Sequence, residues 1–137
     1  MNFLQPWQST TADPRYFEGV VRHADVDRTT GAIGAWDDIH RGSHGDARGS
    51  SANALTDEFL GDYDYAFATN NFVVAAWNDA RNAADCEDID AYRQDIVDGD
   101  AAGEADDPTR PAPQQDCLET FGNTDIFGGS YADPTTP

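Results

Sequence analysis

The chain has 137 residues and a formal net charge of −18, because 26 acidic residues stand against eight arginines and there is no lysine. A surface with this charge repels nucleic acid and anionic membranes, so we expect neither as a partner. No run of ten consecutive apolar residues occurs, so we also expect no membrane insertion. Of the acidic residues, 21 are aspartates spread along the chain, which is typical of a halophilic protein kept soluble in high salt, or of a GC-rich genome.

Residues 15–42 form the first predicted unit, which contains a β-hairpin. Residues 23–26 lead into a turn at residues 27–31, and residues 32–36 return. The acidic side chains of this turn also resemble those of a calcium-binding loop, but the glycine falls one position late and no glutamate follows at position twelve. We therefore interpret the following residues as a hairpin turn: Asp25, Asp27, Thr29 and Gly31.

A group of potential metal ligands follows the first hairpin. Four side chains lie within seven residues of one another: His40, Arg41, His44 and Asp46. Imidazoles and carboxylates are suitable ligands for a transition metal. The glycines and serines of residues 43–53 instead indicate a solvated surface loop. We favour the loop, and we expect neither a metal nor another cofactor.

Residues 55–82 form the second predicted unit. Two runs rich in β-branched and aromatic residues, 63–68 and 72–77, flank a Thr-Asn-Asn sequence at residues 69–71. Because asparagine tolerates positive φ at little cost, this joint predicts a tight turn, and the two runs predict a second β-hairpin.

The two units share a spaced pattern. The sequence Phe-Glu-Gly at residues 17–19 matches Phe-Leu-Gly at residues 59–61 at an offset of 42, and Trp36 matches Trp77 at an offset of 41. A self-similar β-unit of about 40 to 45 residues has the period of a β-propeller blade, so we expect Trp36 and Trp77 at equivalent points of two sheets. Two unrelated hairpins that share these residues by chance are the alternative. A closed propeller needs at least four blades and this chain holds about two, so it is either a fragment or assembles with other copies.

Residues 83–122 are predicted to be an insertion. Apolar residues recur at helical spacing over residues 85–97, which predicts one short amphipathic helix that stops at Gly99. Residues 98–113 are acidic and proline-rich, and we expect them to be irregular. Residues 123–131 then complete the second unit, with residues 125–127 as a last short strand.

The two cysteines, Cys86 and Cys117, bracket this helix and the acidic link. No histidine lies between them to form a zinc site, so they are either a disulfide or two unrelated thiols. Their placement at the two ends of one excursion favours a disulfide, which would contribute on the order of 3 kcal/mol by closing a loop of about 30 residues. A disulfide implies an oxidising compartment, so we expect a secreted protein. The first four residues lack the features of a secretion signal, which we therefore expect on a preceding part.

Three segments carry a resemblance to a known family. They are FLGDY at residues 59–63, WNDARN at residues 77–82 and DIF at residues 125–127. In this order they resemble the closing blade of bacterial and archaeal sialidase-like proteins with BNR-type repeats, and the segments around both cysteines are similar to an insertion of one secreted subgroup. The resemblance covers residues 55–134 and implies that residues 1–137 are the C-terminal part of a six- or seven-bladed β-propeller. The aspartate-box signature of the family is absent.

The resemblance implies that the chain is part of a secreted sialidase-like glycoside hydrolase, inactive without the remaining propeller blades. A non-catalytic propeller module that binds a glycan or a protein is the alternative, since this fold hosts both. Sialidases use a tyrosine nucleophile with a glutamate, three arginines and an aspartate, and the nearest matches here are Tyr63, Tyr65, Glu58 and Arg81. The two tyrosines are more typical of packed sheet residues, and Arg81 is more typical of an ion pair with Asp79, so we assign no catalytic residue.

Overall fold

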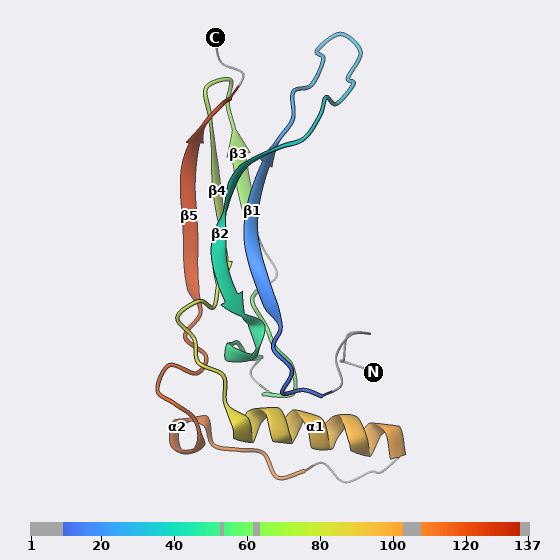
Figure 1. Cartoon of the computed structure of the whole chain (residues 1–137), viewed down its shortest axis with the longest axis vertical. Coiled ribbons are helices and arrows are strands. Elements are labelled where there is room, and N and C mark those ends of the chain that lie inside the picture. Colours follow the sequence, from blue (N-terminus) through green and yellow to red (C-terminus); the bar gives the residue numbers. More distant parts are fainter. Residues whose placement is uncertain (1–9, 53, 62–63, 103–107, 135–137) are drawn as a thin grey trace.

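The computed structural model describes residues 10–52, 54–61, 64–102 and 108–134. Its elements in chain order are β1 (Tyr16–His23), β2 (Asp37–Asp46), η1 (Ala47–Gly49), β3 (Tyr65–Ala68), β4 (Phe72–Asp79), α1 (Glu87–Ala102), α2 (Pro113–Asp116) and β5 (Asp125–Ala132). The chain is mainly β, as the sequence predicts, with β1 and β2 in one antiparallel sheet and β3-β4-β5 in another. In Figure 1 the strands run lengthwise and α1 lies across one end of them.

The first hairpin has longer arms than the sequence predicts. β1 and β2 pair along their length, and an isolated bridge between Val26 and Ile33 continues the hairpin beyond them. The predicted turn is confirmed, because the Asp27 carboxylate accepts the amide N–H groups of Thr29 and Thr30 at 2.8 and 2.9 Å. β2 reaches Asp46, so the surface loop predicted from residue 43 onward is wrong at its start. Cross-strand pairing with β1 overrides the weak strand preference of the glycines there.

The second hairpin and the last strand are confirmed. β3 pairs with β4, and their turn is closed by a hydrogen bond from the Thr69 amide to the Phe72 carbonyl at 2.9 Å. β5 pairs with the whole of β4, from Phe72 opposite Ala132 to Asp79 opposite Asp125, so it is longer than predicted. Tyr63, which we expected in this hairpin, lies outside the described residues.

The two tryptophans do not occupy equivalent positions. Trp36 precedes β2 in the loop of the first hairpin and is 55 % exposed, with the Arg22 guanidinium 5.8 Å from its ring centroid. Trp77 lies inside β4. The expected alignment of the two units at these residues is therefore wrong. The 41-residue offset aligns β3 and β4 with the loop between β1 and β2, and not with these two strands.

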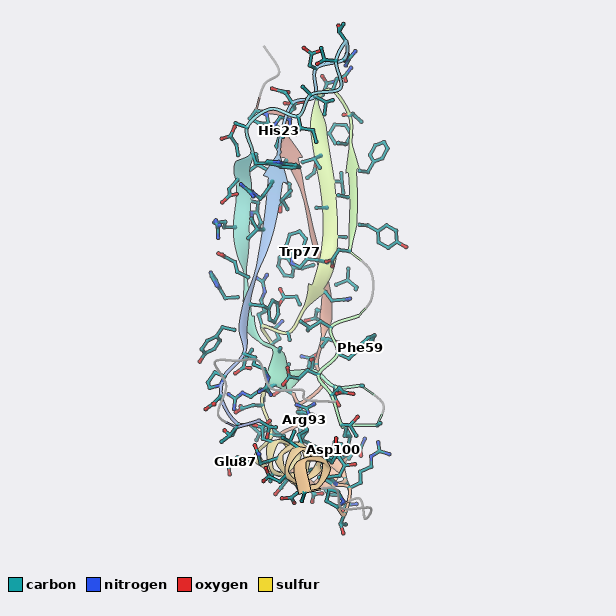
Figure 2. All side chains as sticks on the ribbon, turned by 90° about the vertical axis from the view of Figure 1, so that its right-hand side faces the viewer. His23, Phe59, Trp77, Glu87, Arg93 and Asp100 are labelled. Carbon is teal, nitrogen blue, oxygen red and sulfur yellow. A yellow bond between two sulfur atoms is a disulfide. The ribbon has the colours of Figure 1, made fainter. Side chains whose placement is uncertain are left out.

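The two sheets face each other through an inner layer of side chains. Trp77 lies in this layer, 5.9 Å from His40 of β2 between ring centroids, and Figure 2 shows its indole between the ribbons. A Cβ at Gly19 of β1 would lie 2.7 Å from the Trp77 Nε1, so a residue without a side chain is needed for the sheets to approach this closely. Val21 and Ala75 are buried in the same layer.

A second apolar cluster lies around α1, at the end of the strands. Ile89 is fully buried there beside Leu55, Cys86 and Tyr92, and Ile96, Cys117 and Phe121 pack against this group. The predicted helix is confirmed, but it continues through residue 99 to Ala102 instead of stopping at the glycine. Glycine weakens a helix by only about 1 kcal/mol and does not by itself end one.

The predicted disulfide is confirmed. Cys86 and Cys117 are bonded, with their Cα atoms 5.3 Å apart, and they hold the residues after α1 against its start. The disulfide indicates that the protein matures in a non-reducing compartment. Within the described part of the chain, no helix is both long and apolar enough to cross a membrane.

Candidate binding cleft at the tip of the sheets

The end of the sheets that is remote from α1 is hollowed by a cleft of about 640 Å³, which we call the tip cleft. Figure 2 shows His23 at this end and Glu87 and Asp100 of α1 at the other. Three segments that are far apart in the sequence line the cleft: residues 23–26 with Arg28, residues 68–73 and residues 133–134, together with Ile39. A volume of several hundred cubic ångströms is typical of a small-molecule site.

His23 lies between two carboxylates in the tip cleft. Its Nε2 is 3.6 Å from Asp133 Oδ1 and 3.8 Å from Asp25 Oδ1. Both distances exceed those of a good hydrogen bond, so the contacts are ion pairs only when the imidazole is protonated. Strand pairing positions these groups: His23 ends β1, and Asp133 follows β5, where its amide donates to the Asn71 carbonyl at 2.9 Å.

A polar turn also lines the tip cleft. Arg28 donates from Nη2 to Asn70 Oδ1 at 3.0 Å, which ties the loop of the first hairpin to the turn of the second. Thr69 Oγ1 accepts the amides of Asn71 and Phe72 at 3.2 Å and fixes the shape of this turn. Apolar residues complete the lining: Val26, Ile39, Phe72 and Val73. The cleft therefore combines hydrogen-bonding groups from several segments with apolar surface.

The charge of the tip cleft favours an uncharged or weakly cationic ligand. Arg28 is the only arginine among the described residues that line the cleft, and it stands against the carboxylates of Asp25 and Asp133. The rest of the chain adds to this negative potential, since its formal net charge is −18. An anion would have to enter against both fields.

The residues that the sequence suggested for catalysis lie in separate environments. Tyr65 is 71 % exposed on β3. Glu58 pairs with Arg15 close to α1. Arg81 contacts Asp79 at 2.5 Å and lies 3.6 Å from the centroid of the Phe127 ring. The expected Arg81–Asp79 ion pair is thus confirmed, and these residues do not form one site.

The four potential metal ligands near β2 also diverge. Between Phe17 and Gly19 of β1 the pairing contains a bulge, which adds one residue to β2. Even-numbered residues of β2 before and after the bulge therefore point to opposite faces of the sheet. His40 faces inward, 4.9 Å from the Tyr131 ring, whereas His44 faces outward, 3.4 Å from Glu18. Asp46 binds Arg48, and Arg41 binds Asp38 and Glu18. No group of three or more potential metal-binding side chains occurs among the described residues.

A buried ionic cluster joins α1 to the sheets. Arg48 contacts Asp46 at 2.7 Å, and Asp85 and Asp90 each at 3.2 Å. Burial is the main cause that raises the pKa of Asp90, to about 6, against the opposing effect of Arg48. Arg93 is 4 % exposed and donates to the backbone carbonyls of residues 50, 55 and 57. These contacts are structural: they fix the orientation of the helix, far from the tip cleft.

Sequence reasoning missed both the tip cleft and the ionic cluster. The cleft depends on His23, Asp25 and Asp133, of which only Asp25 was considered, and then as part of a turn. The polar residues of the two hairpin turns were the only signal in the sequence. Such residues predict where loops occur, but not which loops lie together in the fold.

Comparisons with known protein families, characterised proteins and solved structures find no match for this chain. No family, relative or structural neighbour therefore bears on the sialidase resemblance.

Proposed function

We propose that this chain is an extracellular, non-catalytic β-sheet module that binds an uncharged or weakly cationic glycan in the tip cleft. The observation that carries the proposal is the convergence of His23, Asp25, Arg28, Asn70 and Asp133 on one cleft of about 640 Å³.

Glycan chemistry fits this set of groups. Carboxylate and amide oxygens accept hydrogen bonds from sugar hydroxyls, and amide and guanidinium N–H groups donate to sugar oxygens. Val26 and Val73 offer apolar surface beside them, suited to the C–H groups of a sugar ring. Sites of this kind combine apolar lining with a few placed polar groups.

A sialidase-like glycoside hydrolase is the second candidate, and it rests on the three segments described for the sequence. Under this hypothesis, the two sheets belong to successive blades of a six- or seven-bladed propeller. Binding of a sialoside carboxylate would require arginines, and among the described residues these arginines already form ion pairs within the chain: Arg15, Arg22, Arg41, Arg48, Arg81 and Arg93. We therefore expect no hydrolysis of sialosides by this chain alone.

Secretion belongs to the proposal as well. The Cys86–Cys117 bond supports export to an oxidising environment, and the acidic composition supports a salt-rich one.

Calorimetric titration with neutral, amino and sialylated oligosaccharides tests the proposed function. We expect neutral or amino sugars to bind more tightly than sialylated ones. His23→Ala and Asp25→Asn should each weaken binding about tenfold, the equivalent of one hydrogen bond of roughly 1.4 kcal/mol. Asp95→Asn, an exposed site on α1, is the matched control and should bind as the wild type does. Preference for sialylated sugars, or equal affinity of all variants, would overturn the proposal.

A further inference from the structure

The outer face of the β3-β4-β5 sheet exposes large apolar side chains. Ile126 is 74 % exposed, Tyr65 71 %, Phe67 65 % and Val74 41 %. Isolated exposed apolar residues are common in proteins, but a contiguous group of them marks an interaction site.

Strand register places these side chains on one continuous face. Phe67 lies opposite Val74, which lies opposite Ser130, and the next row of the same face runs from Tyr65 through Ala76 to Gly128. Residues two apart on a strand point to the same side, so the two rows are neighbours. The small side chains of the second row keep the middle of the face flat, with the aromatic rings along the β3 edge.

This face differs from the rest of the molecule in charge. None of the side chains that register places on it is charged at neutral pH: Tyr65, Phe67, Phe72, Val74, Ala76, Asn78, Ile126, Gly128, Ser130 and Ala132. The whole chain nevertheless carries 26 acidic residues. A partner for this face is therefore uncharged and apolar where it makes contact.

The face is too small for a stable protein interface. Three strands spaced by about 4.8 Å and up to eight residues long cover roughly 15 by 25 Å, or about 400 Å². A stable protein interface buries about 800 Å² on each partner. The shape is long, narrow and flat, which suits a ribbon-like ligand.

We propose that the outer face of the β3-β4-β5 sheet binds the flat face of an uncharged polysaccharide. Pyranose rings in extended chains present C–H groups on both faces, and these stack on aromatic rings such as those of Tyr65 and Phe67. The site is distinct from the tip cleft and does not depend on the function proposed for it. A polysaccharide offers many equivalent rings in a row. A protein molecule that contacts several of them at once therefore binds the polymer firmly.

Depletion of the protein from suspensions of chitin and cellulose particles tests the site. The wild type should bind one of them, and the double variant Tyr65→Ala/Phe67→Ala should bind at least about tenfold more weakly. Tyr16→Ala on β1 is the matched control, because Tyr16 is 79 % exposed but lies on the other sheet, and its binding should stay within about twofold of the wild type. Phe67→Tyr retains a ring and should retain binding. Circular dichroism melts show whether each variant is folded.

Further outcomes separate this site from the tip cleft and from a protein interface. Binding should persist from about 0.1 to about 1 M NaCl, because no charge pairs are involved. Loss of particle binding in His23→Ala, with Tyr65→Ala/Phe67→Ala unaffected, would assign the particles to the cleft and overturn the inference. Absence of wild-type binding to both particles would overturn it too. So would sedimentation that shows a wild-type dimer abolished by the double variant, because the face would then be a protein interface.

Discussion

On the outer face of the β1–β2 sheet, Arg41 contacts Glu18 at 2.5 Å and Asp38 at 2.7 Å, whereas the outer face of the other sheet exposes Phe67 and Ile126. Arg22 and His44 extend the first set, and we call these five residues the charged ladder. The two sheets pack against each other through one inner layer of side chains. Their outer faces nevertheless differ. The charged side chains are suited to contact with water, whereas the exposed apolar side chains are not.

The charged ladder is matched to water. Both of its arginines are more than half exposed, and the hydrogen bond from Arg41 is the main cause that lowers the pKa of Asp38. Ion pairs of this kind contribute little to stability, typically up to about 1 kcal/mol. The side chains of the apolar face form no such favourable interactions with water. We therefore interpret this face as a binding surface.

The largest expected effect comes from the layer behind both faces. Trp77→Ala should lower the free energy of unfolding by about 3 kcal/mol, because it empties the space between the sheets against Gly19. Urea denaturation followed by circular dichroism measures the loss. Tyr16→Ala, an exposed aromatic on β1, is the control. If both variants unfold at the same urea concentration, the sheets do not share the inner layer that the comparison assumes.

A pH-dependent effect is expected at the junction beneath both sheets. The pKa of Asp90 is raised from 3.8 to about 6, so between these values the folded protein holds a proton that the unfolded chain has lost. The contribution of Asp90 to stability therefore falls as pH rises from about 4 to about 6, by up to about 3 kcal/mol. The Asp90→Asn side chain does not ionise, so its stability relative to the wild type should rise across this range.

Thermal melts at several pH values measure the Asp90 effect. The groups that face this carboxylate are Arg48, Arg93, Arg15 and Asp85. Asp88→Asn, exposed on the same helix, should follow the wild type at every pH. Parallel curves for wild type and Asp90→Asn would show that burial does not shift this group, and that the junction is as solvated as the charged ladder.

The smallest expected effect lies in the charged ladder itself. Arg41→Ala should cost at most about 1 kcal/mol, and the cost should shrink in molar salt, because exposed ion pairs are screened. Urea denaturation in low and high salt measures both values. A loss of several kcal/mol that persists in salt would mean that the charged face is covered, and the contrast between the two faces would fail.

Local chemistry made much of the fold predictable. The turn at Asp27, the second hairpin and the Cys86–Cys117 bond each follow from nearby residues or from a simple bracket in the sequence. The bulge near Gly19 has no such local signal, yet it decides which faces His40 and His44 occupy. Trp36 and Trp77 match in sequence spacing but differ in position, because Trp36 precedes β2 in a loop and Trp77 lies inside β4.

The tip cleft was not predictable because it is made by long-range contacts. His23, Asn70 and Asp133 come together only after both hairpins and β5 have paired and the two sheets have packed. A single sequence specifies the alternation of each strand but not which loops meet at the end of two sheets.

Amide NMR of the isotope-labelled protein, titrated with a soluble neutral oligosaccharide, tests the central claim most directly. It reports on both outer faces and on the tip cleft in one experiment. We predict shifts at His23 and Asn70 in the cleft and at Phe67 and Val74 on the apolar face, with none at Arg41 in the charged ladder. Shifts centred on the charged ladder, or no shifts at any of these amides with saturating sugar, would contradict the account.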